Sequence, residues 1–129
     1  MDNNDASRKK KAVLSIVTVC LNSDKTIEKT IESIKQQKTN GVEYVIIDGD
    51  SHDRTPDIIR SYGDVIDVFV SEPDKGISDA FNKGIAKSSG EVIGLLNADD
   101  QFLPGTIEKV CDYFRSNPET EILHGDILF

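Results

Sequence analysis

The sequence is poor in the residues that build zinc sites and disulfide frameworks. Its 129 residues include two cysteines, Cys20 and Cys111, and two histidines, His52 and His124, which are far apart and form no Cys-x-x-Cys pair. This spacing argues against the common zinc signatures. Each cysteine lies inside an apolar pattern, which predicts buried thiols in a cytosolic protein.

Long apolar runs and an excess of positive charge are also missing. No run approaches the roughly 20 residues of a membrane span, and no signal peptide precedes the first apolar stretch. The net charge of −8 argues against non-specific binding to DNA or RNA. We therefore expect a cytoplasmic protein without a nucleic-acid partner. The basic residues 8–11 are either a solvated tail end or a peripheral contact with the inner face of a membrane.

Several signatures of other α/β proteins are absent. The sequence has no Gly-x-Gly-x-x-Gly after its first apolar stretch, no P-loop motif and no Gly-x-Ser-x-Gly elbow. Cys20-Leu21-Asn22 lacks the acidic pair that a phospho-receiver domain would need there. Dinucleotide dehydrogenases, P-loop NTPases, α/β-hydrolases and receiver domains are therefore disfavoured.

What the sequence does contain is an alternation of β-branched apolar stretches and helical periodicity. Residues 1–11 are polar and are expected to form a disordered tail, and residues 12–129 are expected to form one domain. Five strands are expected, at 13–20, 42–47, 65–70, 91–96 and 121–129, with helices between them at 24–38, 56–62, 78–87 and 104–116. This order predicts an α/β fold with a mostly parallel, doubly wound sheet and helices on both faces.

One apolar stretch, residues 91–100, ends in the adjacent carboxylates Asp99 and Asp100. Its composition predicts a strand buried on both faces. The two acids suit a hard divalent cation such as Mg²⁺ or Mn²⁺, although a polar turn that caps the next helix would look the same. Asp48 and Asp50 follow another predicted strand, so both acid clusters are expected at one edge of the sheet, where such folds bind ligands.

A series of short motifs runs in a fixed order from residue 15 to about residue 126. The motifs are Ser15-Ile16-Val17-Thr18-Val19 with Asn22, Ser33-x-x-x-Gln37, Val45-Ile46-Ile47-Asp48-Gly49-Asp50-Ser51-x-Asp53-x-Thr55, Ser71-Glu72-Pro73-Asp74-Lys75-Gly76-Ile77, Asp79-Ala80-Phe81-Asn82-Lys83-Gly84, Gly90-Glu91 and Leu96-Asn97-Ala98-Asp99-Asp100. Together they resemble the N-terminal half of a family 2 glycosyltransferase with the Rossmann-like GT-A fold. The resemblance implies a nucleotide-sugar donor as partner.

The resemblance also implies roles for individual residues. Asp100 would ligate Mn²⁺ or Mg²⁺, Asp99 would face the metal or the donor ribose, and Asp48 would help to hold the nucleoside. Three further donor-side residues are expected in the following loop and helix: Lys75, Asn82 and Lys83. For the two lysines, a diphosphate contact and solvated surface charge are both open.

Three positions depart from the pattern of many family members. Leu21 replaces a tyrosine that could stack on a base, and Gly49 replaces a second acid, so both changes bear on the nucleobase contact. Phe81 replaces an arginine in the donor helix, which weakens the case for a phosphate contact there.

The family resemblance places the general base beyond residue 129. This chain would then supply the donor- and metal-binding half of an inverting, metal-dependent glycosyltransferase, and would be inactive alone. We expect a role in surface polysaccharide biosynthesis with a glycan or lipid-linked glycan acceptor; the alternative is a nucleotide-binding module without turnover. Apolar residues at the end of the chain predict a homodimer through this segment: Ile122, Leu123, Ile127, Leu128 and Phe129.

Overall fold

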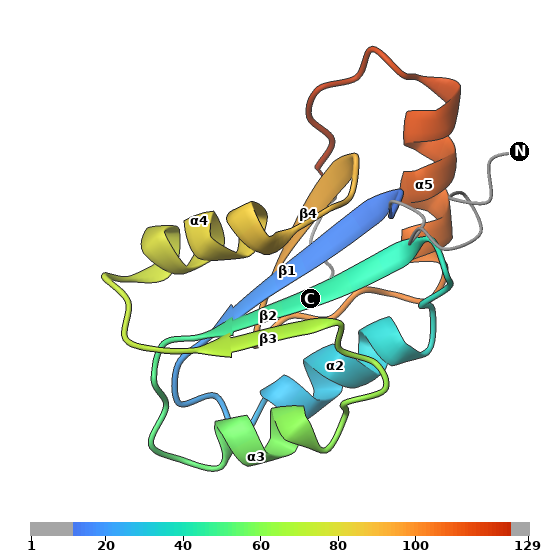
Figure 1. Cartoon of the computed structure of the whole chain (residues 1–129). Helices are drawn as coiled ribbons and strands as arrows, with labels where there is room; N and C mark the ends of the chain where they lie inside the picture. The colour runs from blue at the N-terminus through green and yellow to red at the C-terminus, as the bar shows by residue number, and fades with distance from the viewer. Residues whose placement is uncertain (1–11, 125–129) are drawn as a thin grey trace, which may run out of the picture.

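Four parallel strands form the centre of the molecule (Figure 1). The computed structural model describes residues 12–124. The strands are β1 (Leu14–Cys20), β2 (Val42–Asp48), β3 (Val68–Ser71) and β4 (Val92–Asn97), and their order across the sheet is β3-β2-β1-β4. All three pairings are parallel. The predicted α/β class with a parallel, Rossmann-like sheet is therefore confirmed.

Helices cover both faces of this sheet (Figure 1). On one face, α2 (Ile27–Lys35), α3 (Thr55–Arg60) and α5 (Thr106–Ser116) contribute to a single apolar core with the strands. On the other face, α4 (Ile77–Lys87) packs against β1 and β2 and completes a second, smaller core. The architecture is thus three-layered, as the alternation of strands and helices predicts.

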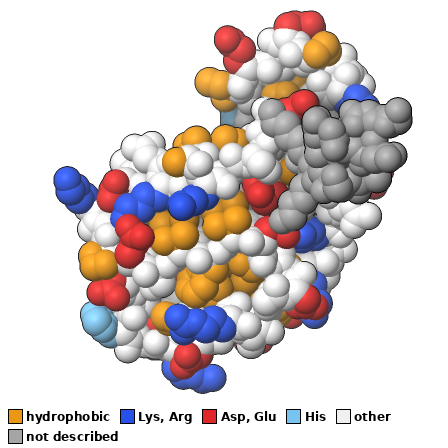
Figure 2. All heavy atoms as spheres, in the orientation of Figure 1, with side chains coloured by type: hydrophobic (Ala, Val, Ile, Leu, Met, Phe, Trp, Pro, Cys, Tyr) orange, Lys and Arg blue, Asp and Glu red, His pale blue; other side chains and the backbone are white. Residues whose placement is uncertain are grey.

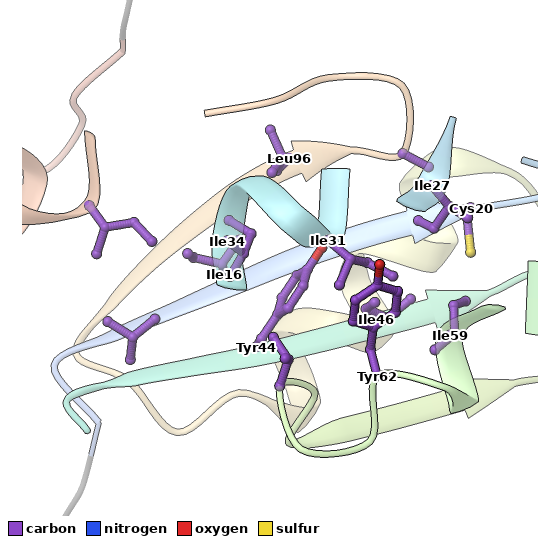
Figure 3. Close-up of a cluster of buried hydrophobic side chains, with 14 of the residues drawn as sticks. Ile16, Cys20, Ile27, Ile31, Ile34, Tyr44, Ile46, Ile59, Tyr62 and Leu96 are labelled. Carbon is purple, nitrogen blue, oxygen red and sulfur yellow. The ribbon is translucent and has the colours of Figure 1, made fainter. Parts of the chain in front are cut away.

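The two cores follow from the alternation of side chains along β1 and β2. Ile16 and Tyr44 belong to the larger core under α2, whereas Val17 and Val45 belong to the smaller core under α4. In the larger core, Ile31 of α2 lies over the strand side chains (Figure 3). The hydroxyl of Tyr44 stays satisfied there because it hydrogen-bonds the Thr18 hydroxyl at 2.9 Å.

The prediction that residues 91–96 form a strand buried on both faces is wrong. Within the described chain β4 pairs only with β1, so it is an edge strand. The helix α4 packs on β1 and β2 and leaves one face of β4 open, so Ile93 is 38% exposed and Leu95 is 52% exposed. Hydrophobic side chains reach the surface among charged groups in the view of Figure 2.

Other differences concern the ends of elements. Residues 61–65 form a turn, so the third strand begins at Val68 rather than at residue 65. The expected last strand is not formed at residues 121–124, which are exposed. The rest of that predicted strand, residues 125–129, and the predicted tail, residues 1–11, lie outside the described residues. Cys111 is half-buried rather than buried. None of the described helices is both long and apolar enough to cross a membrane.

Candidate functional site

The carboxyl ends of β1, β2 and β4 lie side by side. Cys20 at the end of β1 is in register with Asp48 of β2, and Val19 is in register with Asn97 of β4. The predicted meeting of the two acid clusters at one edge of the sheet is therefore confirmed. Ligands of open α/β sheets bind at this edge.

The loops that follow β1 and β2 are joined to each other by hydrogen bonds. The Asn22 amide donates to Ser51 Oγ at 2.7 Å, and the His52 amide donates to Asn22 Oδ1 at 2.9 Å. Asn22 and Asp50 have positive φ angles of 50° and 71°, which non-glycine residues seldom adopt. The interlocking contacts hold both loops in this less favourable backbone conformation.

A second set of contacts extends this joint toward α2 and α3. The Ser23 amide donates to Thr55 Oγ1 at 2.8 Å, and the Asp24 amide donates to Asp53 Oδ2 at 3.2 Å. The Thr55 amide donates to Asp53 Oδ1 at 2.9 Å. Desolvation opposes ionisation of Asp53, but these hydrogen bonds outweigh it and hold the pKa of its carboxyl below the usual value.

Asp48 lies beneath the loops and is fully buried. Its carboxylate accepts hydrogen bonds from the Ser51 amide at 2.9 Å, from Ser51 Oγ at 2.5 Å, from Ser71 Oγ at 2.7 Å and from Cys20 Sγ at 3.3 Å. Burial, followed by the charge of Asp48, raises the pKa of the Cys20 thiol far above its usual value. The carboxylate therefore ties β1, β2 and β3 together from inside.

Asp99 and Asp100 lie in the turn after β4, and both are exposed. The Asp100 amide donates to the Asn97 carbonyl at 3.1 Å. On the other side of the turn, the buried Thr30 of α2 places its hydroxyl 2.9 Å from the Ala98 carbonyl and 2.6 Å from the Asp100 carbonyl. The backbone of this turn is thus fixed against α2, and the carboxylates remain accessible.

An open cleft of about 720 Å³ lies over this edge of the sheet. Its charged lining residues are three aspartates, Asp24, Asp74 and Asp99, and one lysine, Lys25. The remaining lining comes from the end of β1 and its loop, from α4 and from the end of β4: Val19, Cys20, Leu21, Asn22, Ser23, Thr26, Ile77, Ala80, Asn97 and Ala98. Asn97 Oδ1 is buried without a hydrogen-bond partner among the described residues.

The expected donor-side residues are not brought together at this cleft. Of the predicted site residues, Asp99 lines it, whereas Asp48, Asp100, Lys75, Asn82 and Lys83 do not. Lys83 Nζ lies 3.1 Å from Glu72 Oε2 and donates to the Pro73 carbonyl at 2.9 Å. The hydrogen bond to Glu72 raises the pKa of Lys83. Lys75 and Asn82 are exposed.

Lys25 and Asn97 line the cleft without having been predicted there, and so do the acids Asp24 and Asp74. Asn97 could have been found, because it is the last residue of a strand whose carboxyl end was already expected at the site. Lys25 follows the β1 loop, in a stretch that was considered only as the start of a helix. Its position in the cleft depends on the joint between the loops, which leaves no simple sequence signal.

The chemistry of the donor set fits Mg²⁺ or Mn²⁺. Among residues 12–124, no three His, Cys, Asp or Glu side chains are grouped so that they could hold a metal ion by themselves. Asp99 lines the acidic cleft, and Asp100, the next residue in the chain, is exposed; both offer carboxylate oxygens. Mg²⁺ is commonly bound by one or two carboxylates together with substrate phosphates and water, so two acids are sufficient.

A parallel sheet with an acidic cleft over the carboxyl ends of its strands defines a ligand-binding α/β domain of the Rossmann-like type. The chain belongs to glycosyl transferase family 2, because residues 15–124 match the model of that family.

Curated relatives agree with this assignment. An uncharacterized glycosyltransferase of Mycobacterium tuberculosis is 32% identical over 90 residues, which cover 69% of this chain and 34% of the relative. A second, from Haemophilus influenzae, is 29% identical over 112 residues, which cover 87% of this chain and 38% of the relative. A PGL/p-HBAD biosynthesis glycosyltransferase of Mycobacterium bovis is 26% identical over 120 residues, which cover 90% of this chain and 47% of the relative. The chain thus spans about a third to a half of these relatives.

Solved structures share the fold. Residues 1–349 of Staphylococcus aureus TarS, in complex with UDP-GlcNAc, superimpose with a TM-score of 0.75 at 20% identity, covering 80% of this chain and 31% of that one. The mannosyltransferase PcManGT from Pyrobaculum calidifontis, in complex with GDP-Man and Mn²⁺, gives a TM-score of 0.73 at 20% identity. The match covers 81% of this chain and 33% of that one.

Proposed function

We propose that this chain binds the nucleotide-sugar donor of a glycosyltransferase. The observation that carries the proposal is the cleft at the carboxyl edge of the sheet, lined by Asp99 and by more acids than lysines. Such a cleft repels a bare diphosphate, so an anionic donor would enter together with a cation. Complexes of the similar structures with UDP-GlcNAc and with GDP-Man and Mn²⁺ support this proposal.

In this proposal Asp99 and Asp100 hold the divalent cation, Mn²⁺ or Mg²⁺. When bound, the cation neutralises the charge that develops on the departing nucleoside diphosphate. The backbone of the turn that carries both acids is fixed by Thr30, so the two residues keep their place at the end of β4 before the donor arrives.

Asp48 has an indirect role in this proposal. Its carboxylate is buried and accepts hydrogen bonds from Ser51, Ser71 and Cys20, so it shapes the loop over which the nucleoside lies. Lys25 lines the same cleft, and its proposed role is to neutralise part of the diphosphate charge.

The donor-side roles of Lys75, Asn82 and Lys83 also remain proposals. For Lys83 such a role requires exchange of its ion pair with Glu72 for a phosphate contact. Lys75 and Asn82 are exposed on the loop and helix beside the cleft, where a bound donor could reach them.

The proposed reaction transfers the sugar to an acceptor hydroxyl with inversion at the anomeric carbon. An acceptor hydroxyl needs a general base within hydrogen-bonding reach, and we place that base beyond residue 129. The acceptor is proposed to be a glycan or lipid-linked glycan in the biosynthesis of a surface polysaccharide or glycolipid. The Mycobacterium bovis relative, named for PGL/p-HBAD biosynthesis, supports this class of acceptor.

A nucleotide-binding module without turnover is the second candidate. It requires the donor cleft, as the first candidate does. The two candidates differ in whether a protein that contains this chain transfers sugar.

Calorimetry of nucleoside diphosphates with and without Mn²⁺ tests the donor site. We expect tighter binding with Mn²⁺, and we expect Asp100→Ala to remove the difference. Asp64→Ala, an exposed acid in the turn before β3, serves as the matched control and should behave as wild type. Equal affinity with and without the metal would contradict the proposal.

A further inference from the structure

The motif Ser33-x-x-x-Gln37 lies in α2 and in the turn directly after it. Both of its polar side chains contact the segment between β4 and α5, which lies 66 to 70 positions further along the chain. The Phe102 amide donates to Ser33 Oγ at 3.2 Å. Gln37 Nε2 donates to the Leu103 carbonyl at 2.9 Å, and Gln37 Oε1 accepts a hydrogen bond from the Ile107 amide at 3.0 Å. The motif therefore has a defined partner in space.

The side-chain amide of Gln37 is used on both of its ends. Besides the Leu103 carbonyl, Nε2 reaches the Ser33 carbonyl at 3.1 Å. A glutamine amide has two N–H donors and one acceptor oxygen, and here both donors and the oxygen have partners. One side chain thus joins the end of α2, the loop after β4 and the start of α5.

The helix α5 depends on this contact because it has no side-chain cap of its own. Its N-cap residue is Gly105, with a φ of 84°. The first amides of a helix lack partners within the helix, and Gln37 Oε1 supplies one for Ile107. The amide and hydroxyl of Thr106 donate to the Leu103 carbonyl at 3.1 and 2.7 Å. Gln37 and Leu103 together define where α5 begins.

Apolar packing alone does not hold the loop that leads from the acid pair to α5. Phe102 packs against the larger core, but Leu103 is 56% exposed, and Gln101, Pro104 and Gly105 are exposed as well. The position of the loop therefore depends on its hydrogen bonds to the motif.

Thr30 does not fix the preceding turn completely. Its hydroxyl lies within hydrogen-bonding distance of the Ala98 and Asp100 carbonyls. A hydroxyl has one proton to donate, so Thr30 shares it between the two carbonyls and cannot satisfy both fully. Leu103 follows Asp100 by three residues, and three residues of chain span no more than about 10 Å. An anchor at Leu103 therefore restricts the turn from its far side.

We propose that Gln37 is a positioning residue for the turn of Asp99 and Asp100. By holding the Leu103 carbonyl, it sets the direction in which the chain leaves the turn, and with it the placement of the two acids. This inference rests on the proposed function, since it concerns the proposed metal ligands.

Calorimetry of UDP and of GDP with and without Mn²⁺ tests the inference in the whole chain. The measured quantity is the ratio of the two dissociation constants, without and with Mn²⁺, for the nucleotide that binds more tightly. Gln37→Met keeps the length of the side chain and removes its hydrogen bonds. Residues that support metal ligands typically change metal affinity by about ten- to a hundredfold, and we expect this ratio to fall by about tenfold.

Gln37→Glu separates the two contacts of the side chain. A carboxylate still accepts from the Ile107 amide, and negative charge is favourable at the start of a helix. It cannot donate to the Leu103 carbonyl. The variant should therefore keep α5 intact and still lose the gain from Mn²⁺, as Gln37→Met does.

Hydrogen–deuterium exchange gives a readout that needs neither metal nor nucleotide. In Gln37→Met the amides of residues 101–107 should exchange faster than in wild type, whereas in Gln37→Glu the Ile107 amide should stay protected. Mass spectrometry of peptides from this segment measures both rates.

Two controls separate positioning from a general loss of stability. Gln36→Met makes the same substitution at the exposed neighbouring residue and should behave as wild type. Ile59→Val removes a buried methyl group from the larger core under α3, which lowers stability. It should keep the full gain from Mn²⁺. Thermal unfolding checks that each variant is folded at the temperature of the binding measurement.

Failure of the donor site and failure of the positioning role give different results. If Mn²⁺ brings no gain in nucleotide affinity to the wild-type chain, the proposed metal-assisted site itself fails. If wild type shows the gain and either Gln37→Met or Gln37→Glu retains it in full, the site stands and the role of Gln37 is overturned.

Discussion

The hydroxyl of Thr30 lies 2.6 Å from the carbonyl of Asp100, although the two residues are 70 positions apart in the chain. Thr30 is fully buried in α2, and the same hydroxyl also reaches the Ala98 carbonyl. A helix that belongs to the core of the domain thereby supports the turn that carries the proposed metal ligands.

Thr30→Val should weaken both folding and metal-assisted binding. The substitution keeps the shape of the side chain but leaves backbone carbonyls of the turn without their donor, which costs roughly 1–3 kcal/mol. Urea unfolding measures the loss of stability, and calorimetry with Mn²⁺ and nucleoside diphosphate measures the loss of affinity. Thr30→Ser retains the hydroxyl and should bind nearly as wild type; equal binding by Thr30→Val would show that the turn holds its shape unaided.

Gly84→Ala should destabilise the protein although alanine favours helices. Gly84 is buried where α4 meets β1, and an added methyl would clash with the Val17 side chain. The gain in helix propensity is about 1 kcal/mol, whereas overpacking costs typically 1–3 kcal/mol. We expect a lower denaturation midpoint, restored in part by Val17→Ala in the same chain. A rise in the midpoint for the single variant would mean that α4 moves away without penalty.

The stability of the joint between the loops should decrease at acid pH. Desolvation of Asp53 is outweighed by hydrogen bonds from Thr55 and Asp24, so the folded pKa lies below the ordinary value of 3.8. A lowered folded pKa stabilises the native state above the unfolded pKa, and this stabilisation disappears as the pH falls through the folded pKa. Asp53→Asn should therefore show a shallower loss of stability below pH 3.8 than wild type, with exposed Asp57→Asn as control.

The two cysteines should differ in reactivity. Burial and the nearby charge of Asp48 raise the pKa of the Cys20 thiol far above its usual value. Partial burial also raises the pKa of the Cys111 thiol, but the positive charge of Arg115 opposes this shift. Thiolates, not thiols, are alkylated. Iodoacetamide at pH 8 should label Cys111 well before Cys20 in the native protein, and both in urea. Mass spectrometry reads the order, and equal rates in the native state would contradict the buried Asp48 site.

We predict that the 129-residue chain binds nucleoside diphosphate but transfers no sugar. Relatives that it matches are about twice as long as this chain, and transfer needs donor, acceptor and base held together. A radiolabelled or fluorescent donor would be assayed with the chain alone, and with a longer relative as the positive control. Transfer by the chain alone would refute the prediction.

The fold was largely predictable because its signals are local. Apolar β-branched stretches alternate with periodic helices, and that order alone indicates a parallel sheet. The exposure of Ile93 and Leu95 was not predictable, because it depends on α4 packing over β1 and β2 and leaving β4 uncovered. An edge strand and a central strand can share the same composition.

The site was predictable at the level of its edge and not of its individual contacts. Acids that follow strands had to meet at the carboxyl ends, and Asp48 and Asp99 do so. The sequence gives no sign that Asp48 points inward toward Ser51 and Ser71, since its neighbours in space come from other segments. The position of Asp74 was equally hidden, because this residue lines the cleft with its carboxylate lying over Gly49 of another loop.

The joint between the loops after β1 and β2 has a practical consequence for building chimeras from relatives. Asn22 meets Ser51 and His52, and Ser23 meets Thr55. A crossover that takes one loop from one parent and the second loop from another would separate these partners. Segments 20–26 and 49–55 should therefore be transplanted together, as a single cassette, whenever the donor preference of such a transferase is exchanged.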